Sequence, residues 1–248
     1  MTSPFQVIRT EDGSPTLFSE ELHQGYHSVF GAVTEAHHIF IEAGFRFAVN
    51  HLHNPLNNNQ PAPVSSLPGS NSEKLFELKV LEAGFGTGLN ALLTFREASL
   101  SEIRVQYDAI EAFPLPQKVW QQLAYPAESE AVSRNNTFRT IHEAPWDRDS
   151  AISDFFFLHK IHKKLEVFEP GTAQYHLVYF DAFSPEVQPE LWHPDIFSKL
   201  ARSMKDGAVL VTYSAKGTVK QALRQAGLRV ERLAGPPGKR HMIRAHKS

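Results

Sequence analysis

A short glycine-rich stretch, residues 80–90, constrains the fold of this chain most strongly. Its sequence is Val-Leu-Glu-Ala-Gly-Phe-Gly-Thr-Gly-Leu-Asn. The apolar residues before the glycines predict a buried strand, and residues 89–95 continue at helical spacing, so the glycines lie at a strand-to-helix junction. Glycine at such a junction permits a tight turn, close approach of a ligand to the backbone, and close packing of helix on strand. The stretch therefore predicts an α/β fold with a ligand-binding turn.

The spacing of the glycines and the acid before them indicate which ligand to expect. Turns that bind dinucleotides follow a G-x-G-x-x-G pattern and aim backbone amides at a pyrophosphate. Here Glu82 comes two residues before Gly84, and Gly86 and Gly88 follow at alternate positions. A carboxylate at this point would repel a phosphate, but it suits an ammonium group such as that of S-adenosylmethionine. We therefore expect these four residues to bind that cofactor, with a structural turn of an unrelated α/β protein as the alternative.

Two further carboxylates are expected at the same edge of the sheet. Residues 104–111 predict a second strand that ends in Glu111, 23 residues after Gly88. Nucleoside-binding α/β folds place a carboxylate at about this interval on the ribose hydroxyls. Residues 176–180 predict a buried strand followed by Asp181, and the carboxyl ends of parallel strands form the ligand crevice. Asp181 should therefore lie close to the glycine turn, although ordinary surface acids at strand ends are the alternative.

Hydrophobic patterns predict the rest of the sheet and its helices. Further strands are expected at 137–141, 208–213, 228–233 and 241–245. Further helices are expected at 31–41, 116–123, 149–168, 195–204 and 219–226. The final order of helix, strand, turn and strand predicts an antiparallel hairpin, which distinguishes a methyltransferase sheet from a dinucleotide-binding sheet. The predicted fold is thus α/β and Rossmann-like, with a mostly parallel seven-stranded sheet and an antiparallel last strand.

Composition divides the chain into three parts. Residues 1–53, with a hairpin expected around 10–18, form an N-terminal appendage that leads into the core. Residues 54–74 are rich in asparagine and proline and uncharged as far as residue 72, so they predict a flexible insertion. Residues 75–248 form the predicted methyltransferase core domain.

Composition also excludes several classes of protein. The 248 residues include no cysteine, which excludes disulfides, thiolate metal sites and a cysteine nucleophile. No apolar run reaches the roughly 18 residues of a membrane span, and residues 1–5 lack the pattern of a secretory signal, so a cytoplasmic location is expected. His159 and His162, interspersed with lysines, predict a solvated helix face and not a metal site.

The charge is distributed unevenly along the chain. The net charge of −2 by itself argues against a nucleic-acid-binding protein. Residues 199–248, however, contain 12 Lys and Arg against 2 acids, an excess of 10 positive charges. This basic C-terminal segment predicts either a phosphate-facing surface or ordinary surface helices and strands, and charge alone does not separate the two.

Several motifs together resemble one family. They are Gly-Phe-Gly-Thr-Gly-Leu-Asn at 84–90, Asp-Ala-Phe-Ser-Pro at 181–185 with Pro-Glu-Leu-Trp at 189–192, Thr-Tyr-Ser-Ala-Lys-Gly at 212–217 and Gly-Lys-Arg-His-Met at 238–242. The segment from Tyr26 to Glu35 is also similar. In combination they resemble the methyltransferase domain of the MnmC-type tRNA (5-methylaminomethyl-2-thiouridine) methyltransferases. The resemblance covers most of the chain apart from the Asn/Pro-rich insertion.

The resemblance implies S-adenosylmethionine-dependent N-methylation of the 5-aminomethyl group of (2-thio)uridine at the tRNA wobble position. It adds Asn90 and Asp181 to the cofactor-binding residues. It also makes Asp181 the catalytic residue, either as a base or as a group that positions the amine. No metal is expected, because direct methyl transfer onto nitrogen needs none. The residues expected to face the substrate are Tyr26, Ser28, Glu35, Phe183, Pro185, Lys239 and Arg240, of which the last two are expected on an exposed turn that meets phosphate.

The expected partners are tRNA and a separate enzyme or oxidase that supplies the aminomethyl group, since the sequence to Ser248 holds no second dinucleotide-binding motif. Two other functions remain open from the sequence. One is an aminopropyltransferase resembling spermidine synthases, which use a similar sheet and a decarboxylated form of the same cofactor. The other is a non-catalytic nucleoside-binding partner of a separate oxidase.

Overall fold

The computed structural model describes residues 4–53, 77–125 and 134–248. The predicted insertion at 54–74 lies outside these residues, and the division into an appendage and a core domain stays a prediction. Within the described ranges, no helix combines the length and the apolar content that a membrane span requires.

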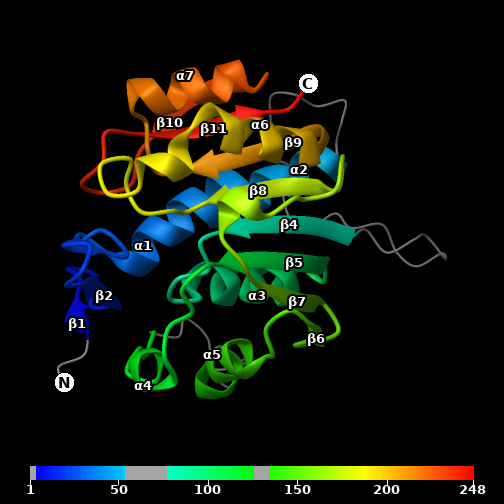
Figure 1. Ribbon diagram of the computed structural model, residues 1–248. Coiled ribbons are helices and arrows are strands. Elements are labelled where there is room, and N and C mark those ends of the chain that lie inside the picture. The colour runs from blue at the N-terminus through cyan, green and yellow to red at the C-terminus, as the bar shows by residue number, and fades with distance from the viewer. Residues whose placement is uncertain (1–3, 54–76, 126–133) are drawn as a thin grey trace.

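Among the described residues, one eight-stranded sheet forms the centre of the molecule (Figure 1). Its spatial order is β10 (Arg229–Ala234), β11 (His241–His246), β9 (Met204–Thr212), β8 (Tyr175–Phe180), β4 (Glu77–Ala83), β5 (Arg104–Glu111), β7 (Phe156–His162) and β6 (Asp149–Ala151). The five strands from β9 to β7 run parallel, and β11 runs antiparallel to both of its neighbours. The predicted sheet type, mostly parallel with an antiparallel last strand, is therefore confirmed. One of its strands is a different segment from the one predicted, and the three-residue β6 is an additional strand at one edge.

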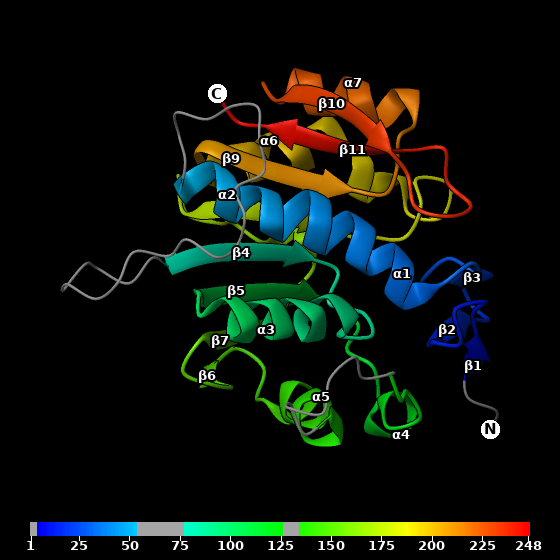
Figure 2. The same cartoon turned by 180° about the vertical axis from the view of Figure 1, so that it is seen from behind.

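Helices cover both faces of this sheet (Figure 2). On one face, Val80 and Leu177 pack in a cluster with α3 (Leu89–Ser101) and with one continuous N-terminal helix made of α1 (Ala32–Ala36), η1 (His37–Arg46) and α2 (Phe47–His53). On the other face, Leu81 and Val178 pack with η3 (Pro189–Trp192), α6 (Pro194–Ser203) and α7 (Gly217–Gln225). Neighbouring residues of a strand face opposite ways, so β4 and β8 contribute apolar side chains to both clusters.

A second, antiparallel sheet of three strands lies beyond the carboxyl ends of the central strands (Figure 2). It comprises β1 (Phe5–Arg9), β2 (Pro15–Ser19) and β3 (Gln24–Gly25), and its first hairpin is the one predicted at 10–18. The carboxylate of Asp12 in that hairpin accepts hydrogen bonds from the backbone nitrogens of Ser14 and Thr34, both at 3.0 Å. Because Thr34 belongs to α1, Asp12 attaches the small sheet to the helical layer.

Residues 137–141 were predicted as a strand, and this prediction was wrong. They belong to helix α5 (Arg134–Glu143). Phe138 and Ile141, three residues apart, are both buried, which is the spacing of a helix face. Packing of that face overrides the high β propensity of Phe, Thr and Ile. The helix predicted at 116–123 is present but shorter, as α4 (Gln117–Trp120).

Residues 149–168 were predicted as one amphipathic helix, and this prediction was also wrong. They form β6, β7 and a short 3₁₀ turn, η2 (Leu165–Val167). Phe156, Leu158 and Lys160 are buried at alternate positions, which is the period of a strand, and β7 pairs with β5 along its whole length. The dense apolar residues fit both periods, so pairing with β5 decided the structure. The count of seven main strands holds because β7 takes the place of the strand expected at 137–141.

The expectation of a solvated helix face around His159 and His162 fails for the same reason. Both residues lie on β7. Lys160 between them is buried, and its ammonium group donates a hydrogen bond to the carbonyl oxygen of His142 at 2.6 Å. No cluster of metal-binding side chains occurs within the ranges that the structure describes.

Candidate active site

The glycine turn follows β4 and requires glycine for its conformation. Gly84, Gly86 and Gly88 have φ angles of 94°, 49° and 73°, all in the left-handed region that side chains disfavour. A Cβ atom on Gly84 would lie 2.6 Å from the backbone oxygen of Asp181. The turn therefore brings the ends of β4 and β8 into direct contact, and α3 begins immediately after it at Leu89.

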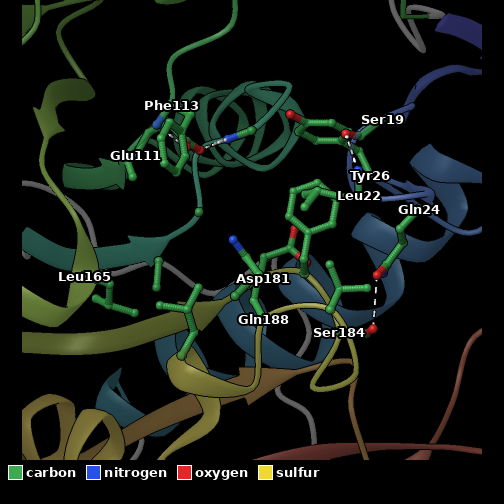
Figure 3. A pocket seen from close by; sticks show the side chains of 18 of the residues that line it. Ser19, Leu22, Gln24, Tyr26, Glu111, Phe113, Leu165, Asp181, Ser184 and Gln188 are labelled. Atoms are coloured by element: carbon green, nitrogen blue, oxygen red, sulfur yellow. Dashed lines mark hydrogen bonds between the residues drawn. The ribbon is translucent and has the colours of Figure 1, made fainter. Parts of the chain in front are cut away.

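A cavity of about 1110 Å³ opens at the carboxyl ends of β4, β5 and β8 and extends to the three-stranded sheet. In Figure 3, Glu111 and Phe113 project into it on one side and Tyr26 and Gln24 on the other, with Asp181 between them in this view. Pockets for a single small ligand usually measure about 300–1,000 Å³. This cavity thus exceeds the needs of a cofactor alone.

Glu111 forms one end of the cavity. Its carboxylate accepts hydrogen bonds from the backbone nitrogen of Gly86 at 2.9 Å and from that of Phe113 at 2.9 Å. These two bonds hold the carboxylate at the cavity wall, while each oxygen keeps capacity for another donor. Phe113 beside it is 69% exposed, which is unusual for a phenylalanine and leaves its ring available to a ligand.

Asp181 and Glu82 are linked by Asn90, the second residue of α3. The side-chain amide nitrogen of Asn90 donates to Glu82 at 2.9 Å and to Asp181 at 2.8 Å. Glu82 is fully buried beneath the turn, and burial raises its pKa well above the usual range, with the charges of Asp181 and Glu111 adding to the effect. Glu82 therefore acts on the cavity through Asn90, whereas Asp181 lines it directly.

The carboxyl group of Asp181 titrates near neutrality. Burial raises its pKa from 3.8 to about 7; the charge of Glu35 adds to this effect, and the hydrogen bond from Asn90 and the charge of Lys239 oppose it. A general base works best when its pKa lies near the operating pH. Asp181 has this property, which favours the role of a base between the two roles left open by the sequence.

The cavity lining also contains an ion pair between Glu35 of α1 and Lys239 of the turn between β10 and β11. Glu35 is buried, and its second oxygen accepts a hydrogen bond from the backbone nitrogen of Ser28 at 2.7 Å. The ammonium group of Lys239 lies 4.2 Å from the centre of the Tyr213 ring, a cation–π contact. The hydroxyl of Tyr213 donates to the carbonyl oxygen of Ala182 at 2.9 Å, which fixes the ring.

The three-stranded sheet closes the cavity by docking on the loop after β8. The Tyr26 ring meets the Phe183 ring edge to face at 4.9 Å between centroids. The hydroxyl of Ser184 donates to the side-chain oxygen of Gln24 at 3.0 Å (Figure 3). The N-terminal residues are thus part of the cavity wall.

The structure brings most of the sequence-predicted site residues to this cavity. The residues among them that line it are Tyr26, Ser28, Glu35, Gly84, Gly86, Glu111, Asp181, Phe183 and Lys239. Glu82 and Asn90 lie beneath the turn, and Gly88 caps α3. Pro185 and Arg240 are not among the described residues that line the cavity. Arg240 is exposed on the surface.

Sequence reasoning missed several cavity residues. Gln24, Phe113 and Tyr213 line the cavity but were not singled out. Tyr213 lies in the motif at 212–217, and Phe113 comes two residues after Glu111. Both could have been predicted from these neighbouring features of the sequence. Gln24 sits in a two-residue strand with no distinctive pattern.

Comparison with known proteins places this site in a family context. Residues 147–248 match the model of a family described as S-adenosyl-L-methionine-dependent methyltransferase. The chain has the fold of these methyltransferases. The prediction of a methyltransferase fold that uses S-adenosylmethionine is thereby confirmed.

The chain is also similar to longer proteins. It is 28% identical over 258 residues to the tRNA 5-methylaminomethyl-2-thiouridine biosynthesis bifunctional protein MnmC of Idiomarina loihiensis, covering 99% of this chain and 39% of the relative. The protein of the same name from Ralstonia nicotianae is 29% identical over 240 residues, covering 93% of this chain and 32% of the relative. The resemblance to MnmC-type proteins noted in the sequence is confirmed, and the chain spans about a third of these relatives.

Two solved structures share the fold of this chain. MnmC2 from Aquifex aeolicus matches with a TM-score of 0.74 at 21% identity, covering 100% of this chain and 72% of that one. Spermidine synthase from Thermotoga maritima matches with a TM-score of 0.55 at 11% identity, covering 98% and 68%. At these identities the matches establish the fold alone.

Proposed function

We propose that this chain methylates the primary amine of 5-aminomethyl(-2-thio)uridine at the wobble position of tRNA, with S-adenosylmethionine as the methyl donor. The observation that carries the proposal is the position of Asp181, which lines the cavity beside the glycine turn and has a pKa of about 7. The names of the MnmC relatives point to the same nucleoside.

The residues around the turn fit S-adenosylmethionine. Gly84 and Gly86 line the cavity without side chains, and a Cβ atom there would meet the backbone oxygen of Asp181 or the Tyr26 ring, so the cavity wall at the turn is bare backbone. Glu111 offers carboxylate oxygens that suit the two hydroxyls of a ribose. The side-chain oxygen of Asn90 is buried and has no hydrogen-bond partner among the described residues, so it provides an acceptor for an ammonium group beside Asp181. When bound, the cofactor supplies a methyl group that an amine nitrogen can attack.

Asp181 gives the amine the form in which it reacts. An amine is nucleophilic only when its lone pair is free, so a cationic amine has to lose a proton first. The carboxylate of Asp181 accepts this proton, and Tyr26 and Phe183 form an aromatic wall against which a nucleobase can be held in position. Formation of the new bond between nitrogen and carbon is balanced by cleavage of the bond between that carbon and sulfur.

We propose the basic C-terminal segment as the surface that meets tRNA phosphates. Residues 199–248 hold 12 Lys and Arg against 2 acids, and Arg240 is exposed next to the cavity residue Lys239. Recognition of a base splayed out of a tRNA loop would then take place in the cavity, while phosphate contacts supply affinity. An enzyme that produces the aminomethyl group must act before this reaction, in the cytoplasm expected from the sequence.

A second candidate function is aminopropyl transfer, which the fold shared with spermidine synthase favours. The competing donor, decarboxylated S-adenosylmethionine, differs in the carboxylate of its methionine moiety. Calorimetry with both donors distinguishes the two functions: preference for intact S-adenosylmethionine supports methyl transfer, and preference for the decarboxylated form supports aminopropyl transfer.

The direct test of the proposal is incubation with methyl-labelled S-adenosylmethionine and tRNA carrying 5-aminomethyluridine. We expect label in the wobble nucleoside and none in the same tRNA with unmodified uridine. Cofactor binding without any transfer to the aminomethyl tRNA would favour a non-catalytic nucleoside-binding protein instead.

A further inference from the structure

We propose that Glu35 and the face of Tyr213 form a subsite that binds the cationic form of the substrate amine, and that Lys239 occupies this subsite until the substrate arrives. The inference rests on the proposed function. It assigns the recognition of the amine to a different carboxylate from the one that removes its proton.

Glu35 has the placement of a cation ligand. Its carboxylate is buried yet lines the cavity, and a buried carboxylate requires a positive or hydrogen-bonding partner. The backbone nitrogen of Ser28 satisfies one oxygen, and the other oxygen is bonded by Lys239. A substrate ammonium group can therefore replace Lys239 at this second oxygen, while the bond from the Ser28 backbone stays in place.

Tyr213 completes the subsite. The Lys239 ammonium group lies 4.2 Å from the ring centre, so the same cation touches a carboxylate and an aromatic face. Ammonium groups bind at such combinations, because the ring attracts the cation without neutralising it. The hydrogen bond from the Tyr213 hydroxyl to Ala182 keeps the ring in place whether or not Lys239 is there.

The subsite lies next to the group that would take the proton. Glu35 and Lys239 are both close enough to Asp181 to act on its carboxyl group electrostatically. Ala182, which holds Tyr213, directly follows Asp181 in the chain. A primary ammonium group bound at Glu35 thus lies near a carboxylate that can accept one of its protons.

Lys239 can move away from Glu35 more readily than Glu35 can move. It is a partly exposed side chain on the turn between β10 and β11, whereas Glu35 is buried in a helix. When Lys239 is displaced from Glu35, its ammonium group becomes available beside the exposed Arg240, where tRNA phosphates are proposed to lie. Substrate binding would then convert an internal ion pair into a phosphate contact, which reconciles the cavity position of Lys239 with the role expected from its sequence.

The test uses two substitutions with opposite expected effects. Binding of two tRNAs, identical except for the aminomethyl group on the wobble uridine, is measured in the presence of S-adenosylhomocysteine. Glu35→Gln should lower the preference for the aminomethyl tRNA by at least about tenfold, because hydrogen bonds to charged groups contribute about 1.5–3 kcal/mol. Lys239→Met should raise that preference, because it removes the competing cation and keeps an apolar chain over Tyr213.

A purely structural ion pair predicts the same direction for both substitutions, since either one breaks it. A fall in preference with Lys239→Met, or no change, would overturn the inference even if Glu35→Gln fails to fold, because Lys239 lies on a surface turn. Lys220→Met is the matched control: it removes a charge from the same basic C-terminal segment, on α7 and outside the cavity. Any loss of affinity should be equal for the two tRNAs, so the preference should stay unaltered.

The outcome for the parent protein separates this inference from the proposed function. If the parent neither methylates the aminomethyl tRNA nor prefers it, the proposed function fails. If the parent does both while the two variants shift the preference in the same direction, the function stands and the subsite is wrong.

Discussion

The side-chain amide nitrogen of Asn90 donates a hydrogen bond to Asp181 at 2.8 Å. The same nitrogen donates to Glu82 at 2.9 Å, so one amide separates two carboxyl groups at the carboxyl ends of neighbouring strands. The buried Glu82 holds Asn90 in orientation, and Asn90 in turn orients Asp181 toward the cavity. This arrangement explains why an acid comes before the glycine turn although it does not reach the cavity.

Replacement of Asn90 by Ala should shift the pH dependence of methyl transfer. The hydrogen bond from Asn90 lowers the pKa of Asp181, so its loss raises that pKa and moves the acid limb of kcat/KM to higher pH. The variant should also lose about 1–3 kcal/mol of stability, because buried acceptors lose their donor. Ser99→Ala, which removes another side-chain hydrogen bond on α3, should leave the pH profile in place. An unshifted acid limb in Asn90→Ala would contradict the role given to Asn90.

Asp181→Asn should stabilise the protein most at high pH. The pKa of Asp181 is about 7 in the folded state against an ordinary value of 3.8, so the folded state binds more protons between these values. The free energy of unfolding contributed by this group therefore falls as the pH rises from about 4 to about 7. We expect the gain of the variant over the parent, measured as the shift of the thermal midpoint, to be larger at about pH 8 than at about pH 5. Equal gains at both pH values would show that the pKa of Asp181 is not raised.

Glu111→Ala should weaken cofactor binding. The substitution removes the carboxylate proposed to hold the ribose and the acceptor that orders the backbone of Gly86 and Phe113. Calorimetry should show that the free energy of S-adenosylmethionine binding is weaker by about 1.5–3 kcal/mol, which is the contribution of a charge-assisted hydrogen bond. Glu143→Ala, which removes an exposed carboxylate paired with Arg139, serves as the control. Unchanged affinity in Glu111→Ala would remove the ribose assignment.

Gly84→Ala should destabilise the protein more than a glycine substitution of similar conformation elsewhere. Gly84 and Gly227 have φ angles of 94° and 81°, so alanine costs about 1–2 kcal/mol of backbone energy at either position. Only at Gly84 does the added Cβ meet a backbone atom, the oxygen of Asp181 at 2.6 Å, whereas Gly227 has open space. Urea unfolding should show that the free energy of unfolding falls by about 3 kcal/mol or more for Gly84→Ala and by about 1–2 kcal/mol for Gly227→Ala. Similar losses would show that the two strand ends are not in contact at the turn.

The parts of the site that the sequence predicted are those with a local signal. The glycine turn needs left-handed backbone at three alternate positions, and only glycine adopts it readily, so the pattern is visible in the sequence. The acids Glu111 and Asp181 end or follow apolar runs, and parallel strands bring such ends together. Strand β7 was missed because its apolar residues fit a helix as well, and pairing with β5 is not a local property.

The rest of the site depends on contacts between distant parts of the chain. Glu35 and Lys239 are 204 positions apart, and no spacing rule joins them. Their pairing follows from the way the N-terminal helix lies on the sheet next to β11, an arrangement set by packing and not by sequence period. The raised pKa of Asp181 likewise results from its tertiary surroundings, so no local pattern in the sequence predicts it.

The most direct test of the account is single-turnover methylation of tRNA carrying 5-aminomethyluridine, followed by mass analysis of the wobble nucleoside, for the parent and for Asp181→Asn. The account predicts 5-methylaminomethyluridine from the parent, with a rate that falls below about pH 7 as Asp181 becomes protonated. It predicts a rate about 10²–10⁴-fold lower for Asp181→Asn, the usual contribution of a general base, with cofactor affinity retained. An unmethylated nucleoside from the parent, or equal rates for the two proteins across this pH range, would contradict it.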